Sequence, residues 1–144
     1  MSYSVSKVEV WTREIDDRTG SLAAALKPLA DAGVDLSFLI ARRYSHQPGK
    51  GVIYLGGVSG AKAEKAAEAA GLKKTTDLAA LRVEGPNQPG DCYQVASRLA
   101  EAGLNLRGVS ASVIGKTYTL MLAFNKAADA DAAARLLGAG GKGK

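Results

Sequence analysis

The sequence contains an internal repeat in which the second copy follows the first at an offset of 70 residues. Residues 17–41 align with residues 87–111 without a gap. The identical pairs include Gly20 with Gly90, Leu29 with Leu99, Ala32 with Ala102, Gly33 with Gly103, Leu36 with Leu106 and Ala41 with Ala111. This period exceeds the roughly 20 to 50 residues of solenoid and propeller repeats. We therefore expect each copy to fold as a small domain, and the chain to be a tandem pair.

The chain length of 144 residues allows two such domains, each with little core of its own. We expect a first domain at 1–76, a second at 77–138 and a flexible basic tail at 139–144. Domains this small gain stability by packing on each other or on a second chain. A homodimer is therefore the predicted assembly.

Composition is that of an ordinary globular protein, with 47% hydrophobic and 23% charged residues. No apolar run approaches the roughly 20 residues that span a bilayer, and the first residues lack the apolar core of a signal peptide. The single Cys92 cannot form a disulfide within the chain, which favours a cytoplasmic location. The net charge of +5 comes from scattered Lys and Arg residues, a pattern that favours a mixed-charge surface over a nucleic-acid groove.

Apolar periodicity predicts the same order of elements in both copies. In the first copy it predicts strands at 5–13, 34–43 and 51–55, helices at 21–32 and 61–70, and a short last strand at 72–76. In the second copy it predicts strands at 78–84, 104–113 and 117–125, and helices at 91–102 and 127–137. Nothing after Leu137 can supply a last strand, so the second sheet is expected to borrow one from the other half or from another chain.

The first helix of each copy has one apolar face. The residues spaced at i, i+3, i+4 and i+7 are Leu22, Ala25, Leu26 and Leu29 in the first copy and Cys92, Val95, Ala96 and Leu99 in the second. Cys92 is thus expected to fill the buried position that Leu22 takes. Pro28 falls inside the first of these helices, where it should cost about 3 kcal/mol or bend the helix. Ser59 is the predicted N-cap of the helix at 61–70, and Gly33 and Gly71 are predicted to end the helices before them.

The order strand, helix, strand, strand, helix, with a hairpin between the central strands, is that of the ferredoxin-like βαββαβ plan. The sequence therefore predicts an α+β protein of two such domains, each an antiparallel sheet with helices on one face.

The two strand-to-helix loops resemble the loop of the ACT domain, whose pattern is Asp-x-Pro-Gly-x-Leu, then a helix, then Gly-x-Asn-Ile. The second copy has Asn-Gln-Pro-Gly-Asp-Cys at 87–92 and Gly-Leu-Asn-Leu at 103–106. The first copy has Asp-Arg-Thr-Gly-Ser-Leu at 17–22, and Asp35 stands where the pattern has Asn. The resemblance covers nearly the whole chain, which is similar to small free-standing proteins built of two ACT domains.

The resemblance implies a regulatory protein that binds an amino acid or related small metabolite at an interface between ACT domains. Such a protein passes its state to an enzyme or regulator, which the sequence does not identify. The ligand-binding positions implied are Asp17, Thr19, Gly20, Ser21, Leu22, Asp35, Asn87, Gln88, Pro89, Gly90, Asp91, Cys92, Asn105 and Leu106.

The chemistry of the loops supports a ligand with a carboxylate and an ammonium group. The free N–H groups at the start of a helix carry partial positive charge, which suits a carboxylate. Asn87 and Asn105 in the second copy offer acceptors for an ammonium group, as do Asp17 and Asp35 in the first. Charged acceptors bind more strongly than amides, so the two sites are expected to differ. The carboxylate of Asp91 would compete with that of the ligand for the helix N–H groups.

Two other functions stay open. The Gly, Asp and Asn residues of the loops could serve only in turns and helix caps, which would make the chain a structural dimerisation module. RNA-recognition domains share the ferredoxin-like order, but the stacking aromatic residues expected on their central strands are missing here apart from Tyr118.

Residues for catalysis are few. His46 is the only histidine and lies in the hairpin loop of the first copy, and Cys92 has no recognisable histidine partner. The sequence shows no cluster of metal ligands and no cofactor motif. We expect no enzymatic activity.

Overall fold

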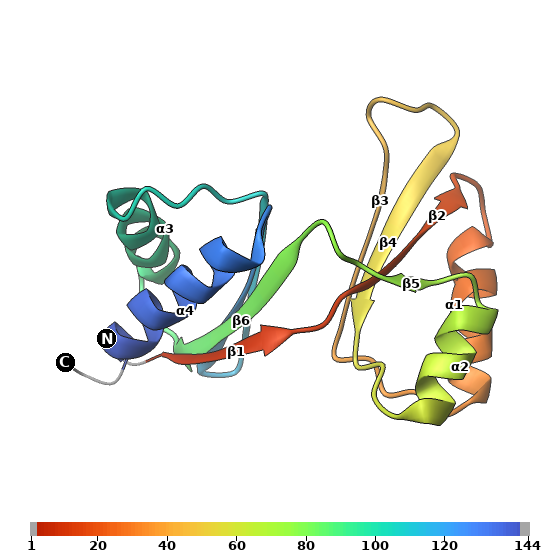
Figure 1. Ribbon diagram of the computed structural model, residues 1–144, viewed down its shortest axis with the longest axis horizontal. Coiled ribbons are helices and arrows are strands. Elements are labelled where there is room, and N and C mark those ends of the chain that lie inside the picture. Colours follow the sequence, from red (N-terminus) through yellow and green to blue (C-terminus); the bar gives the residue numbers. More distant parts are fainter. Residues whose placement is uncertain (1–2, 142–144) are drawn as a thin grey trace. The chain divides into compact units, whose positions relative to one another are not determined.

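The computed structural model describes residues 3–141, which form two compact units. One unit contains residues 9–75, and the other combines residues 3–8 with residues 76–141. Each unit has a four-stranded antiparallel sheet with two helices on one face (Figure 1). The predicted fold class, α+β with two ferredoxin-like βαββαβ units, is confirmed.

The unit of residues 9–75 corresponds to the first copy. Its elements are β2 (Trp11–Asp16), α1 (Ser21–Asp31), β3 (Phe38–Arg43), β4 (Lys50–Gly56), α2 (Ala61–Ala69) and β5 (Lys73–Lys74), and its sheet order is β3-β4-β2-β5. Alternate residues of the central strands face the helices, so Trp11, Ile53 and Leu55 are buried against Leu29 of α1 and Ala67 of α2. The short last strand expected at 72–76 is β5, which pairs with β2.

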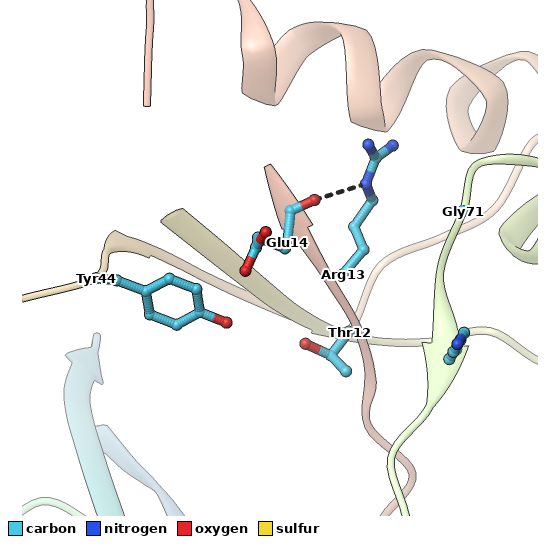
Figure 2. Close-up of a pocket in the computed structure, with 6 residues that line it drawn as sticks. Thr12, Arg13, Glu14, Tyr44 and Gly71 are labelled. Carbon is cyan, nitrogen blue, oxygen red and sulfur yellow. Dashed lines mark hydrogen bonds between the residues drawn. The ribbon is translucent and has the colours of Figure 1, made fainter. Parts of the chain in front are cut away.

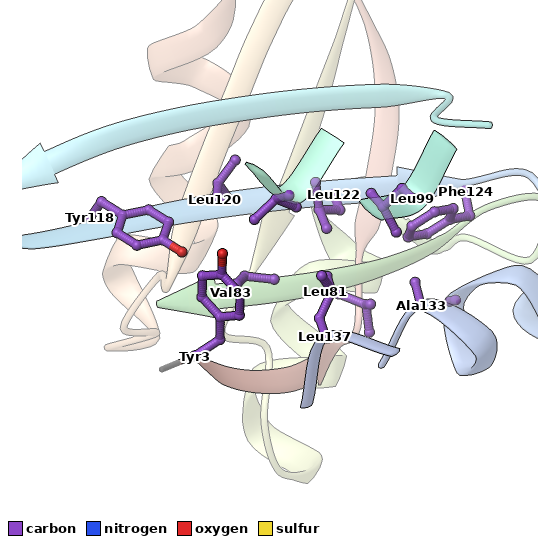
Figure 3. Packing of buried hydrophobic residues seen from close by; sticks show 12 residues of the cluster. Tyr3, Leu81, Val83, Leu99, Tyr118, Leu120, Leu122, Phe124, Ala133 and Leu137 are labelled. Carbon is purple, nitrogen blue, oxygen red and sulfur yellow. The ribbon is translucent and has the colours of Figure 1, made fainter. Parts of the chain in front are cut away.

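The other unit corresponds to the second copy. Its elements are β1 (Ser4–Val8), β6 (Ala79–Pro86), α3 (Asp91–Glu101), β7 (Gly108–Ile114), β8 (Thr117–Phe124) and α4 (Ala127–Gly141), and its sheet order is β1-β6-β8-β7. Every second residue of β8, from Tyr118 to Phe124, is buried beneath the helices. Figure 3 shows this core, in which Leu99 of α3 and Leu137 of α4 pack on the sheet residues Leu81 and Leu122.

The predicted first domain, at 1–76, wrongly includes the N-terminal residues up to Val8, which belong to the other unit. The apolar pattern at 5–13 indicates one strand, but the chain forms two strands there, β1 and β2, which belong to different sheets. β1 pairs antiparallel with β6, with Val5 opposite Val83. The N-terminal strand of the chain therefore supplies the last strand that the second copy lacks. Local alternation could not reveal this, because it predicts a strand without predicting its partner.

An ion pair also joins β1 to α4, since Lys7 Nζ lies 2.5 Å from Asp131 Oδ1. The hydrogen bond from Lys7 holds the pKa of Asp131 below its ordinary value. A carboxyl group whose pKa is depressed in the folded state stabilises that state above its unfolded pKa, and the contribution is lost as the pH falls through the folded pKa.

We therefore expect Lys7→Met to lower the unfolding midpoint in urea slightly at neutral pH and to leave it unchanged in strong acid. Both side chains are largely exposed, so the effect should be small and should shrink in high salt. If the unfolding midpoints of the natural chain and Lys7→Met still differ at the most acidic pH, the ion pair between Lys7 and Asp131 is not the cause of the difference.

Several element boundaries differ from those predicted. Pro28 does lie inside α1, which begins at Ser21 and continues to Asp31. Gly33 and Gly71 have positive φ angles just after their helices, as expected of glycines that end a helix. Ser59 is not the N-cap of α2, because Gly60 takes that position and no side chain caps the helix.

The second strand of each copy begins later than its apolar pattern suggests. β3 starts at Phe38 and β7 at Gly108. The N–H groups of Val34 and Leu104 still donate to the carbonyls of Leu29 and Leu99 in the preceding helices. At the C-terminus, α4 extends to Gly141, so the tail predicted at 139–144 is wrong for its first three residues. Residues 142–144 lie outside the described part of the chain.

Candidate functional site

The predicted binding loop of the second copy borders a cavity of about 340 Å³. Its lining residues are Asn87, Gln88, Pro89, Gly90, Asp91, Cys92, Tyr93, Ala111, Ser112, Val113 and Tyr118. The first six form the whole run that the sequence marked at 87–92. The cavity thus lies between the start of α3 and the neighbouring strand β7.

Hydrogen bonds hold the loop in place. The Asn87 N–H donates to the Lys116 carbonyl at 2.8 Å, which joins the loop to the β7–β8 turn. The Gln88 N–H donates to Asp91 Oδ2 at 2.6 Å. Gly90 has a φ of 88°, a left-handed conformation that residues with a side chain rarely adopt. The loop therefore turns sharply into α3, and the carboxylate of Asp91 binds the loop itself.

The N-terminus of α3 forms one end of the cavity. The Gln94 N–H donates to the Gly90 carbonyl at 2.9 Å, which is the first hydrogen bond of the helix. The N–H groups of Cys92 and Tyr93 precede that bond, so they have no partner within an α-helix and carry its partial positive charge. The expected competition from Asp91 is reduced, because its carboxylate accepts a hydrogen bond from Gln88.

Tyr118 closes the cavity from the side of the core. Its side chain is only 3% exposed, and its ring meets that of Tyr3 edge to face with centroids 6.2 Å apart. The hydroxyl groups of the two residues point toward one another (Figure 3). Burial raises the pKa of Tyr118 well above its ordinary value, and Tyr3, Asp91 and Cys92 raise it further. Tyr118 is therefore a neutral residue throughout the physiological pH range.

The structure does not bring every predicted residue of the second copy to this cavity. Asn105 is exposed, and Leu106 packs partly buried against the core beside β7. Neither residue lines the cavity. Cys92 is exposed, so its predicted place on the buried face of the helix is wrong. Val95 and Leu99 cover the sheet instead.

Sequence reasoning missed the opposite wall of the cavity. Ala111, Ser112 and Val113 come from β7, and Tyr118 comes from β8. The hairpin predicted between the strands at 104–113 and 117–125 was the available signal, because it sets these two strands side by side. It could not show that the loop at 87–92 lies next to them, since that depends on how α3 packs on the sheet.

The predicted residues of the first copy are placed differently. Asp17 Oδ2 forms an ion pair with Arg43 Nε at 2.9 Å, so this acceptor already has a cationic partner. Gly20 has a φ of 91°, close to that of Gly90 in the other loop. Thr19 and Asp35 are exposed, whereas Ser21 is half-buried and Leu22 packs partly buried against the core. The two copies thus share a loop conformation but differ in the charge that the loop presents.

The unit of residues 9–75 also has a cavity of about 390 Å³ that the sequence did not predict (Figure 2). It is lined by Thr12, Arg13, Glu14, Tyr44, Gly71 and Lys73. Arg13 donates to the Glu14 carbonyl at 3.1 Å and to the Ala70 carbonyl at 2.7 Å, so its guanidinium satisfies the end of α2. Its hydrogen bonds give Arg13 a structural role at the end of that helix.

Within residues 3–141, no group of three or more His, Cys, Asp or Glu side chains could hold a metal ion. In the same range, no helix is both long and apolar enough to cross a membrane.

Comparisons with solved structures match nearly the whole chain. Protein BT0572 from Bacteroides thetaiotaomicron matches with a TM-score of 0.72 and 18% identity, over 92% of this chain and 88% of that one. The ligand-free regulatory subunit of aspartate kinase from Thermus thermophilus matches with a TM-score of 0.64 and 16% identity, over 95% of both chains. Aspartokinase III from E. coli, in complex with aspartate and ADP, matches with a TM-score of 0.59 and 12% identity, over 95% of this chain and 32% of that one.

These likenesses show the fold. The chain has the tandem ACT fold, and a regulatory subunit of similar length has the same arrangement of elements. No family model matches the sequence, and no curated protein matches it.

Proposed function

We propose that this protein is a regulatory protein without catalytic activity that binds an α-amino acid, or a related small metabolite, in the cavity between the 87–92 loop and β7. It acts in the cytoplasm as a homodimer and passes its state to a partner enzyme or regulator. The single observation that carries the proposal is that the whole marked run at 87–92 lines one cavity. The likeness to a regulatory subunit of aspartate kinase supports the regulatory part.

The cavity suggests how the ligand is oriented. Its carboxylate would bind the N–H groups of Cys92 and Tyr93, where the helix end is partly positive. Its ammonium group would bind near the carboxylate of Asp91 and the amide of Asn87, which line the same cavity. The side chain of the ligand would then contact Ala111 and Val113 of β7.

The charge of the lining sets the class of ligand. Asp91 is the one charged residue among those that line this cavity. A ligand with a second carboxylate would be repelled by it, whereas a neutral or basic amino acid would not. We therefore propose neutral or basic amino acids as ligands, in preference to aspartate and glutamate.

The test is thermal unfolding of the full chain with each of the twenty amino acids. A ligand present at about 100 times its dissociation constant adds about 2.7 kcal/mol to the free energy of unfolding, which is a clear shift in Tm. Absence of a shift with every amino acid would refute the ligand assignment and favour the structural dimerisation module.

Asp91→Asn tests the orientation. We expect it to weaken binding of the ligand found in the screen about tenfold or more, because a charged acceptor for the ammonium group is lost. Asp17→Asn in the first copy is the matched control, and isothermal titration of both variants should show full affinity only in the control. Equal affinity in the two variants would place the ligand elsewhere.

A further inference from the structure

A further cavity, of about 540 Å³, lies between α2 and β5. Glu64 and Glu68 of the helix line it, as do Lys73 and Lys74 of the strand. Trp11, the only tryptophan of the chain, also lines it and is 4% exposed. None of these residues belongs to the two loops that resemble the ACT pattern. The cavity is therefore separate from the ligand site proposed above.

The indole N–H of Trp11 is a donor without an acceptor. Trp11 Nε1 is buried and forms no hydrogen bond within the described part of the chain. Buried donors that lack a partner are uncommon in folded proteins, because the N–H loses its hydrogen bonds to water and gains none in return. An acceptor that enters this cavity would supply the missing hydrogen bond.

Lys74 places a positive charge beside the same indole. Lys74 lies opposite Trp11 of β2, whereas Lys73 lies opposite the next residue of that strand. Residues opposite each other share a face of the sheet, so the side chains of Lys74 and Trp11 lie on the helix side and that of Lys73 on the other. The Lys74 ammonium group lies over the Trp11 ring, 5.9 Å from its centroid. The indole N–H and this ammonium group together suit a carboxylate.

The helix side of the cavity carries two carboxylates. Glu64 and Glu68 are four residues apart on α2, so their side chains are neighbours on one face of the helix. Both residues are exposed, and neither forms an ion pair within the described residues. Like charges at this spacing repel each other, and a cationic group beside them relieves that repulsion. This side of the cavity therefore suits an ammonium group.

We propose that this cavity binds a small molecule that carries both an ammonium group and a carboxylate. Its ammonium group pairs with Glu64 and Glu68. Its carboxylate accepts hydrogen bonds from Trp11 Nε1 and from Lys74. A ligand with a single charge would leave either the carboxylates or the donors of the cavity without a partner, so full affinity needs both charges. The site is independent of the proposed function, because it uses no residue of the 87–92 loop.

Binding requires one side chain to move, because Trp11 Nε1 is closed to solvent. Lys74 is the side chain that can do so. It is 48% exposed, and its ion pair with Glu9, at 3.3 Å, lies at the surface. Exposed ion pairs contribute little to stability. The carboxylate of the ligand therefore draws the ammonium group away from the ring and takes a place beside the indole N–H.

The fluorescence of the full chain tests this site directly, because Trp11 is its only tryptophan. The probes are ω-amino acids of increasing length, from β-alanine to 6-aminohexanoate. Butyrate and butylamine, which carry one charge each, are the controls. We expect at least one of the ω-amino acids to change the emission of Trp11 in a saturable way, and both controls to leave it unchanged. The effect should weaken in high salt, because the charges of the site are exposed.

Variants that remove charge test the assigned contacts. We expect the double variant Glu64→Gln/Glu68→Gln to weaken binding of the same ω-amino acid about tenfold, because two exposed charge pairs are lost. Lys74→Gln should weaken it as well, through the carboxylate. Lys62→Gln and Asp31→Asn are the matched controls, since they remove one charge from the same unit outside the cavity, and they should bind as the natural chain does. All five residues are exposed, so these variants should fold.

The outcomes separate this site from the loop site. Unchanged emission of Trp11 with every ω-amino acid would overturn the proposal. An equal response to butyrate or butylamine would overturn the class of ligand, and full affinity in Glu64→Gln/Glu68→Gln would overturn the assigned contacts. Binding of α-amino acids at the 87–92 loop is measured separately, by the loss of affinity in Asp91→Asn, so either site can stand without the other.

Discussion

A chain that begins at Glu9, and so lacks β1, is expected to lose the stable fold of residues 76–141 while residues 9–75 stay folded. β1 supplies five paired residues to β6, and without it this central strand becomes an edge. The buried side chain of Tyr3 just before it is also lost, as is Val5, which packs on the same core. Removal of one large buried aromatic side chain costs about 3 to 5 kcal/mol, a large share of the total stability of a small domain.

Amide hydrogen exchange followed by mass spectrometry would measure this, because it reports protection separately in the two units. Peptides from β6 and β8 should lose protection in the shortened chain, and peptides from β4 should keep it. Within the full chain, Tyr3→Ala should lower the free energy of unfolding by about 3 kcal/mol or more. Tyr93→Ala is the matched control, since that tyrosine is 71% exposed, and its effect should stay within about 0.5 kcal/mol. Unchanged protection of β6 without β1 would contradict the assignment of this strand.

Gly57→Ala is expected to destabilise the unit of residues 9–75 by about 3 kcal/mol or more, through overpacking and backbone strain. Gly57 follows β4 and has a φ of 100°, which a side chain disfavours. A Cβ atom there would also meet main-chain atoms of the segment that leads to β3, at 2.7 Å from Ser37 N and closer still to Asp35 O. Main-chain atoms cannot rotate away, so β3 or β4 would have to move.

Gly60→Ala separates the two causes. Gly60 has a φ of 90°, but a Cβ atom at this position would have no other atom within 4 Å. This variant should therefore lose only the cost of the backbone conformation, about 1 to 3 kcal/mol. Urea unfolding of the full chain, followed by the fluorescence of Trp11, would compare the two. Equal losses would show that the close approach to residues 35 and 37 relaxes without cost.

Much of the fold could be predicted from local patterns. The spacing of Leu22, Ala25 and Leu29 marked the buried side of α1, and alternation along 117–125 marked β8. Such patterns are readable because side chains repeat every 3.6 residues on a helix and every two on a strand. Comparison of the two copies gave the elements of the second from those of the first, and the ACT-like loop at 87–92 consists of residues that line a cavity in the structure.

The surroundings of individual side chains depend on partners rather than on periodicity. Cys92 matches Leu22 in spacing, yet it is exposed at the start of α3. Asn105 matches the ACT pattern, yet it is exposed and is not among the residues that line the cavity. Asp17 was expected to be available for an ammonium group, but it forms an ion pair with Arg43, which is distant in sequence. Each outcome was decided by residues that no local window contains.

The sequence by itself determined that this chain has two related ferredoxin-like units, with an ACT-like loop in each. Only the tertiary structure decided that β1 belongs to the second unit and that β7 forms one wall of the cavity. The physical reason is that main-chain hydrogen bonds between strands are the same for every sequence, so the pattern of a strand does not specify its neighbour. Which strands become neighbours depends on how well the side chains of both strands are buried together. That combined burial is present only in the folded chain.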